Sequence, residues 1–257
     1  MSGLLEGRVA VVTGAARGQG QAVATRFAAE GADLVLADLN EEGLAQTQAL
    51  VESAGRKALV VRTDLTREDD LKRLADQAGG AYGKVDILYN NAGIISGGSV
   101  DAIDWDTFDT VMAVNAKSQL FLVKYLLPHF KAAGSGAIVN VSSMGGLVGA
   151  PHNTVYAASK AAVSGVTRCL AVELDPFGIR VNCIAPGAVD TPMPGVFLAH
   201  FQGEELAHMK GLLVSRQIQK RWAHVDEIAA VATFLVSDQS SFLTGLIIPV
   251  DGGYSAQ

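Results

Sequence analysis

Residues 8–20 read RVAVVTGAARGQG, a short β-branched run followed at once by three glycines. We expect Arg8–Thr13 to form a strand and Gly18–Glu30 to form a helix. Gly14 permits a tight turn between them, and the two later glycines let the backbone approach a pyrophosphate at the helix N-terminus, where anions are favoured. The spacing G-x3-G-x-G differs from the commoner G-x-G-x-x-G. For these residues alone, a plain strand-to-helix turn remains the alternative.

Strand-like and helix-like stretches alternate along the rest of the chain. The expected strands are Asp33–Ala37, Ala58–Val61, Asp86–Tyr89, Ala137–Val141, Ile179–Ile184 and Leu246–Val250. The expected helices are Glu41–Ser53, Arg67–Tyr82 and those near 104–132, 154–174 and 225–236. Continuous apolar strands between helices indicate an α/β fold with a doubly wound parallel sheet, the Rossmann fold, in a single domain. The segment at about 192–222 fits the alternation poorly, so we expect a lid-like insertion over the carboxyl ends of the strands.

Composition and charge narrow the class of protein. The chain has 257 residues, a net charge of −6 and a sequence pI of about 5.3, which gives no basic field for nucleic acid or an anionic membrane. Cys169 and Cys183 lack metal-ligand spacing, and we interpret both as buried residues in a reducing compartment. With no signal-like start and no apolar stretch of membrane-spanning length, we expect a soluble cytoplasmic protein.

Asp38, at the end of the second predicted strand, bears on cofactor choice. A carboxylate there can accept both hydroxyls of an adenine ribose and would repel the 2′-phosphate of NADP. The alternative is a helix N-cap or a solvated loop carboxylate. Arg17 could welcome a 2′-phosphate, whereas Leu39 offers no cation. We weigh Asp38 more heavily and predict NAD as the cofactor.

Tyr156 and Lys160 lie four residues apart on the helix expected near 154–174, which places them on one face. Tyrosine is a poor base at neutral pH, since its ordinary pKa is about 10. A nearby ammonium stabilises the phenolate and lowers that pKa. The pair alone is common by chance, and an exposed lysine beside a packed tyrosine is the alternative.

The order of several motifs along the chain is more specific than any one of them. After the glycine cluster come Asn90-Asn91-Ala92-Gly93, Asn115, Ser142-Ser143, and Tyr156 with Lys160. In this set the sequence resembles the short-chain dehydrogenase/reductase family in its single-domain form. The resemblance runs from about Arg8 to Gly253 and includes Val250-Asp251-Gly252-Gly253 near its end.

The resemblance implies a catalytic group of four residues. Tyr156 matches the tyrosine that acts as acid/base, and Ser143 matches the serine that holds the substrate oxygen. Lys160 matches the lysine that binds the nicotinamide ribose and lowers the pKa of the tyrosine. Asn115 matches the asparagine that anchors a water in the proton relay. The implied activity is hydride transfer between NAD(H) and a secondary alcohol or ketone.

The resemblance also implies the cofactor contacts and an oligomer. Asp64-Leu65 would cradle the adenine, and Pro186-Gly187 with Val189 and Thr191 would grip the nicotinamide end. The full predicted set is Gly14, Arg17, Gly18, Gln19, Gly20, Asp38, Leu39, Asp64, Leu65, Asn91, Ala92, Gly93, Tyr156, Lys160, Pro186, Gly187, Val189 and Thr191. Gln19 departs from the aliphatic residue usual at its position and should alter contacts near the pyrophosphate or the nicotinamide. A homotetramer is expected, with apolar residues of the helices near 104–132 and 154–174 at an interface.

Other polar and apolar groups admit ordinary interpretations. His200 and His208 lack a third ligand, so no metal site is expected. His152 either borders the substrate or is a surface histidine. Met193, Phe197, Leu198 and Phe201 form an apolar group that is either a helix face or a lid over an apolar substrate.

Two other functions compete with a free alcohol or ketone substrate. A non-catalytic dinucleotide sensor could share the fold, although the intact catalytic group argues against it. A reductase of carrier-bound β-ketoacyl chains is the main rival within enzymes. Such reductases usually use NADP and carry basic residues near the site mouth, at two positions that align with Gly134 and Phe177 here.

Overall fold

The computed structural model describes residues 3–193 and 202–256. One sheet of seven parallel strands forms its centre, in the order β3-β2-β1-β4-β5-β6-β7. The strands are β1 (Val9–Thr13), β2 (Asp33–Asp38), β3 (Ala58–Arg62), β4 (Ile87–Asn90), β5 (Gly136–Val141), β6 (Ile179–Pro186) and β7 (Ile247–Val250). The predicted doubly wound α/β fold and its single domain are therefore confirmed.

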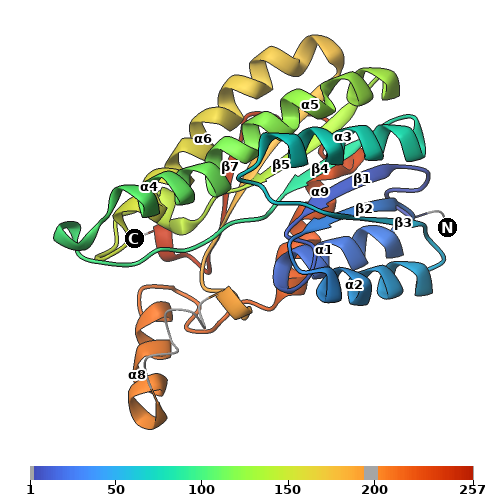
Figure 1. Ribbon diagram of the computed structural model, residues 1–257. Coiled ribbons are helices and arrows are strands. Elements are labelled where there is room, and N and C mark those ends of the chain that lie inside the picture. The colour runs from blue at the N-terminus through green and yellow to red at the C-terminus, as the bar shows by residue number, and fades with distance from the viewer. Residues whose placement is uncertain (1–2, 194–201, 257) are drawn as a thin grey trace.

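Helices cover both faces of this sheet, as Figure 1 shows. One layer contains α1 (Gly18–Ala29), α2 (Glu41–Ser53) and α9 (Val225–Val236), and the other contains α3 (Glu68–Tyr82), α5 (Ser118–Ala133) and α6 (Thr154–Leu174). All five residues of β1 are buried. Ala10 and Val12 pack into the first layer and Val11 into the second. This two-sided burial is the reason that β1 is a continuous apolar run and does not alternate between apolar and polar residues.

The long helix expected near 104–132 is interrupted. It consists of α4 (Trp105–Met112), a π-helical turn at Ala113–Lys117, and α5. A π turn holds one extra residue per turn and is common at functional sites. The interruption brings Asn115 into a fully buried position.

The segment at 192–222 contains a helix, α8 (Gly203–Val214), which stands away from the body of the domain in Figure 1. Phe197, Leu198, His200 and Phe201 lie outside the described residues. The prediction that this segment acts as a lid stays a prediction. Within the described part of the chain, no helix combines the length and apolar character needed to cross a membrane.

One expectation about the cysteines is wrong. Cys183 is fully buried in β6, but Cys169 is exposed on α6. The helix is amphipathic, and Cys169 follows the exposed Arg168 on the side that faces away from the sheet. Burial of a cysteine in a helix depends on which face it occupies, which its residue type alone does not give.

Candidate functional site

The carboxyl ends of β1 and β4 meet at the centre of one edge of the sheet. These strands are neighbours although β2 and β3 separate them in sequence, so the winding direction reverses between them. Open α/β sheets bind ligands at such a reversal point. The glycine cluster follows β1 and the Asn-Asn-Ala-Gly sequence follows β4, which places both motifs at this point.

The glycine cluster forms a loop that has no room for a side chain at Gly14 or Gly20. A Cβ on Gly20 would lie 2.0 Å from the carbonyl oxygen of Gly14, and one on Gly14 would lie 2.7 Å from Nδ2 of Asn91. Asn91 Nδ2 donates to Thr13 O at 3.1 Å, and Thr13 Oγ1 accepts from the N–H groups of Asn91 at 3.0 Å and Ala92 at 3.1 Å. The two motifs are therefore locked together, and α1 begins from this loop with its N–H groups directed to the edge of the sheet.

Two further features of Gln19 and Gly18 indicate that this loop binds a ligand. Oε1 of Gln19 is buried and has no hydrogen-bond partner within the described structure. An orphaned buried amide is costly, so a group that pairs with it is expected there. A Cβ on Gly18 would lie 3.4 Å from Cγ2 of Thr191, so this loop also touches the segment that follows β6. Oε1 is an acceptor, so its partner must be a donor such as a ribose hydroxyl or the amide of a nicotinamide, whereas the main chain around Gly18 and Gly20 is the part of the loop that fits a pyrophosphate.

Asp38 is oriented toward the same loop. Its Oδ2 accepts from the Ala16 N–H at 3.2 Å, and its Oδ1 accepts from the Asn40 N–H at 3.0 Å. The N-cap of α2 is Asn40, whose side chain accepts from Gly43 N. Asp38 is therefore not the helix N-cap, and one alternative for it is removed. The half-buried carboxylate is held at the end of β2, where an adenine ribose would lie.

The neighbours of Asp38 differ in exposure. Arg17 is exposed at the start of α1, and the Leu39 side chain is 52% exposed. Asp64 and Leu65, after β3, are both half-buried, and Asp64 Oδ1 accepts from the N–H and Oγ1 of Thr66 at 2.9 and 2.7 Å. All four stand at the ends of β1, β2 or β3, along the same edge as the glycine loop.

Four predicted catalytic residues gather beside the loop. A Cβ on Gly145 would lie 3.6 Å from Ser143 Oγ and 3.7 Å from the Tyr156 ring, so these two side chains face a common space. Nζ of Lys160 lies 5.8 Å from the centroid of that ring. On the other side, a Cβ on Gly93 would lie 3.1 Å from Lys160 Nζ and 3.2 Å from Asn115 Oδ1. Residues that follow β4 and β5 thus form one group with residues of α6 and the π turn.

Burial shifts the pKa values of the two titratable members. Burial raises the pKa of Tyr156, and the neighbouring Ser143 hydroxyl acts in the opposite direction. Burial lowers the pKa of Lys160 to about 8, and its Nζ donates to Val141 O at 2.9 Å. The sequence predicts a lowered tyrosine pKa. In the protein alone the direction is opposite, because desolvation outweighs an ammonium that is directed to a carbonyl.

Asn115 is held by protein groups at both ends of its amide. Oδ1 accepts from the Ile94 N–H at 2.8 Å, and Nδ2 donates to Ile94 O at 2.9 Å and to Ser159 Oγ at 3.0 Å. Ser159 Oγ in turn donates to Tyr156 O at 2.7 Å. The side chain therefore fastens the loop after β4 to α6, and its role as the anchor of a water stays a prediction.

Sequence analysis missed the linking roles of Thr13 and Ser159, which join these motifs. Each stands directly before a motif residue, Gly14 or Lys160, and that adjacency is the signal that could have identified them. Ser142 Oγ donates to Lys160 O at 2.7 Å, so Ser142 is turned away from the site. His152 is exposed, has a positive φ of 61°, and lines a hollow of about 70 Å³ beside residues 96–107.

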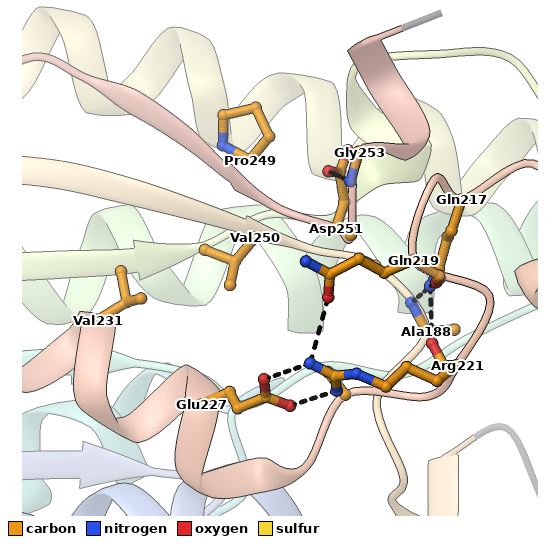
Figure 2. Close-up of a pocket in the computed structure, with 13 residues that line it drawn as sticks. Ala188, Gln217, Gln219, Arg221, Glu227, Val231, Pro249, Val250, Asp251 and Gly253 are labelled. Carbon is orange, nitrogen blue, oxygen red and sulfur yellow. Dashed lines mark hydrogen bonds and ion pairs between the residues drawn. The ribbon is translucent and has the colours of Figure 1, made fainter.

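A larger hollow of about 420 Å³ lies behind the segment that follows β6 (Figure 2). Residues 187–188, 217–223 and 249–253 line it together with side chains of α9. Of the predicted site residues, it includes Gly187 alone. This hollow is distinct from the space between Ser143 and Tyr156.

Gly134 and Phe177, which the sequence comparison with carrier-dependent reductases singled out, lie away from this site. Gly134 ends α5 just before β5, and Phe177 precedes β6. Both lie at the amino ends of their strands, at the edge of the sheet opposite Tyr156. Their lack of charge therefore says nothing about the mouth of the site in this chain. A position in sequence does not reveal which edge of the sheet a residue occupies.

No group of three metal-ligating side chains occurs among the residues that the structure describes. His208 is exposed on α8. The site presents the buried side chains of Tyr156, Lys160 and Asn115 and the half-buried side chain of Ser143, beside the glycine loop.

Comparisons with known proteins agree with this geometry. Residues 14–255 match the protein family described as enoyl-(acyl carrier protein) reductase. The chain is 41% identical over 250 residues to cis-4-hydroxycyclohexanecarboxylate dehydrogenase of Sinomonas cyclohexanicum, covering 97% of each chain. It is 37% identical over 250 residues to a 3-oxoacyl-(acyl-carrier-protein) reductase of Thermotoga maritima, covering 97% of this chain and 98% of that one. The crystal structure of carveol dehydrogenase from Mycobacterium avium, in complex with NAD, matches with a TM-score of 0.94 and 31% identity, covering 99% of this chain and 100% of that one.

Proposed function

This chain belongs to the short-chain dehydrogenase/reductase family, and from that premise we propose that it transfers a hydride between NAD(H) and a secondary alcohol or ketone. It is a short-chain alcohol dehydrogenase or ketone reductase, and Tyr156 is proposed as its general acid/base. The observation that carries the proposal is the gathering of Tyr156, Ser143, Lys160 and Asn115 beside the glycine loop.

The side chains divide the proton chemistry among them. In oxidation, the Tyr156 phenolate takes the hydroxyl proton of the alcohol, and the Ser143 hydroxyl donates a hydrogen bond to the substrate oxygen. In reduction, the phenol returns the proton to the carbonyl oxygen. Lys160, with a pKa of about 8, carries a proton at neutral pH, and its charge stabilises the phenolate.

The glycine loop, Asp38 and the segment at 186–191 would hold the dinucleotide. When bound, NAD+ supplies the acceptor for the carbinol hydride. Asp38 supports NAD over NADP, because a second anion on the ribose would lie against its carboxylate. The orphaned Oε1 of Gln19 is an acceptor, so it supports a donor group of the cofactor, such as a ribose hydroxyl or the nicotinamide amide, beside the loop.

Direct binding and turnover measurements test this proposal. NADH fluorescence titration should give saturable binding, and a panel of secondary alcohols that includes cis-4-hydroxycyclohexanecarboxylate and carveol should give NAD+ reduction. Burial raises the Tyr156 pKa in the protein alone, but the positive nicotinamide of bound NAD+ favours the phenolate together with Lys160. We therefore expect the oxidation rate of the cofactor complex to rise with pH through an apparent pKa below about 10, a value that belongs to the coupled group. NADH binding without turnover on any alcohol or ketone would favour a non-catalytic sensor.

Reduction of carrier-bound β-ketoacyl chains is a second candidate, supported by the 37% identity to the Thermotoga maritima reductase. A competition assay separates the two. The leading proposal expects free ketones to be reduced at a higher kcat/KM than an acetoacetyl group on acyl carrier protein. The reverse order, together with a preference for NADPH, would establish the rival.

We also propose a homotetramer. Large apolar side chains are exposed on the helices expected at an interface, among them Trp105 (81%), Phe108 (42%) and Val172 (77%). Exposed apolar side chains on adjacent helices are typical of subunit contacts. Light scattering at micromolar concentration should give four times the chain mass of 26.8 kDa, and a monomer would refute it. The expected cytoplasmic location stays a prediction.

A further inference from the structure

Gln217 places a buried side-chain amide where separate segments of the chain meet. The residue is 2% exposed. Its Oε1 accepts from the Ala188 N–H at 3.2 Å, and its Nε2 donates to Gln219 O at 3.0 Å and Arg221 O at 2.8 Å. Both donors and the acceptor of the amide are therefore used. Figure 2 shows this side chain directed at Ala188 and at the turn that carries Arg221.

Backbone hydrogen bonds hold the same junction from both sides. Ala223 N donates to Ala188 O at 2.9 Å, and Asp190 N donates to Ala223 O at 3.0 Å. Gln219 N donates to Gly252 O at 2.9 Å. The turn at 217–223 thus lies between the segment after β6 and the segment after β7, and Gln217 satisfies the one backbone donor of Ala188.

The segment at 186–191 spans the two halves of the site. It begins at the end of β6, next to the strand that leads to Ser143, and Ser142 N donates to Ile184 O at 2.8 Å. At its other end Thr191 packs against Gly18 of the glycine loop. A dinucleotide with its pyrophosphate at Gly18 and its reactive ring near Tyr156 must run along this segment. The adenine end, near Asp38, lies outside it.

The other end of the turn is anchored independently. Arg221 makes a two-pronged ion pair with Glu227 of α9, with both N–O distances 2.7 Å (Figure 2). If the Gln217 amide is replaced by an apolar group, Ala188 N–H, Gln219 O and Arg221 O all lose a partner. Because Arg221 stays fixed to α9, the rearrangement falls on Ala188 and its neighbours.

We propose that Gln217 is a positioning residue that fixes the 186–191 segment through Ala188, and so holds the nicotinamide half of the cofactor in place. This inference rests on the proposed function, since it assumes that a nicotinamide dinucleotide binds at the edge of the sheet. Gln217 does not touch the reacting atoms. It acts through the segment that lines their path.

The test compares two ligands that share the adenine end. Gln217→Met keeps the length of the side chain and removes its hydrogen bonds. We expect the NADH dissociation constant to rise about tenfold or more, because small displacements of a bound reactant are costly. Binding of AMP, which ends before the pyrophosphate and the second ribose, should change less than about twofold. The matched control is Gln219→Met on the same turn, whose exposed amide accepts from Arg221 Nη2 at 3.2 Å, and it should change neither constant.

Kinetics add a readout that a purely structural role would not give. In Gln217→Met, kcat should fall and KM for NAD+ should rise, while the pH profile set by Tyr156 keeps its apparent pKa. Equal weakening of NADH and AMP, or no change in either, overturns the proposal. Failure of wild-type protein to bind either ligand would refute the proposed function instead, so the two failures are distinguishable.

A wild-type measurement covers the case in which Gln217→Met does not fold. Hydrogen–deuterium exchange is followed in peptides that contain 186–191 and 217–223. The proposal expects NADH to slow exchange in both peptides together, and AMP, which ends before the pyrophosphate, to leave both nearly unchanged. Protection of 186–191 without protection of 217–223 overturns it, because the two segments would then move separately.

Discussion

The glycine loop and the proposed catalytic group meet at the carboxyl ends of the strands. The loop is formed by main-chain contacts, whereas the catalytic group is formed by side chains. The loop at 13–20 is shaped by main-chain contacts so close that a Cβ on Gly20 would lie 2.0 Å from Gly14 O. The proposed catalytic group consists of the buried Tyr156, Lys160 and Asn115 with the half-buried Ser143, and burial moves the pKa of Tyr156 up and that of Lys160 down to about 8. We therefore expect the glycine loop to bind the cofactor through the shape of its main chain, and the catalytic group to act through the positions of its protons and charges.

This difference predicts where each kind of substitution acts. Changes in the loop should weaken cofactor binding through steric conflict. Changes in the catalytic group should act on turnover and on pH dependence while the loop still binds. Substitutions in each region therefore test whether the two are separable.

The largest effect is expected for Tyr156→Phe. The substitution removes one oxygen and retains the ring, so packing should survive while the proton path is lost. General acid/base catalysis contributes roughly 10²–10⁴-fold, and kcat should fall by at least that factor. NADH affinity, measured by fluorescence, should stay close to the wild-type value.

Tyr125→Phe is the matched control. That hydroxyl donates to Glu68 Oε1 on the surface at 2.6 Å, far in sequence from the catalytic group. Its removal should leave kcat unchanged. Retention of more than about a tenth of kcat by Tyr156→Phe, with an unchanged pH profile, would remove Tyr156 from the mechanism.

Lys160 should make stability depend on pH in a way that the loop does not. Its pKa is lowered from 10.5 to about 8 in the folded protein, so between these values the unfolded chain binds more protons. The free energy of unfolding therefore rises with pH across that window, and the gain is lost as pH falls back to about 8. The expected rise is about 3 kcal/mol in the free energy of unfolding.

Lys160→Met should lack this rise, and the difference between wild type and variant in denaturant unfolding at pH values from about 7.5 to about 10.5 measures it. Lys117→Met, at an exposed lysine of the π turn, should keep the wild-type dependence. Parallel curves for wild type and Lys160→Met would mean that the ammonium is not desolvated in the folded protein.

The loop is tested by Gly20→Ala. Its Cβ has to displace the Gly14 carbonyl, and such overpacking costs about 1–3 kcal/mol of stability. NADH binding should be lost because the loop changes shape, whereas Gly80→Ala, in an open position on α3, should bind NADH normally and gain about 0.5–1 kcal/mol. Normal NADH affinity in Gly20→Ala would show that the loop does not hold the pyrophosphate.

Much of the fold follows from the sequence because the strands are buried on both faces. A continuous apolar run between two helices, such as Val9–Thr13, is typical of a strand covered on both sides, and α2, α6 and α9 span the predicted residues. The glycine loop is equally predictable from the sequence, since a loop whose main chain is to approach a ligand closely needs glycine at fixed positions. The π turn at Ala113–Lys117 is not predictable in this way, because the spacing of apolar residues in a helix does not reveal one extra residue in a single turn.

Side-chain interactions between distant segments escaped sequence analysis. The Gln217 side chain accepts a hydrogen bond from the main chain of Ala188, 29 residues away. A polar residue in a predicted loop gives no sign of so distant a partner. The sequence predicts a lowered pKa for Tyr156, and this predicted direction is wrong for a related reason. It depends on burial and on Lys160 Nζ being directed to Val141 O, and helical spacing gives neither.

The smallest of the expected effects concerns cofactor choice, where the loop and a charge act together. Asp38 is held by two backbone N–H groups, from Ala16 and Asn40, so its carboxylate keeps its place at the end of β2, where we propose that the adenine ribose binds. Asp38→Ala should lower the ratio of kcat/KM for NAD+ to that for NADP+ by about tenfold or more, since about 1.4 kcal/mol of lost repulsion and lost hydrogen bonding suffices. Asp64→Ala, at the end of the neighbouring strand β3, should weaken both cofactors alike and leave the ratio unchanged. A wild-type preference for NADP+, or an equal shift of the ratio in both variants, would mean that the exposed Arg17 decides cofactor choice and that Asp38 does not.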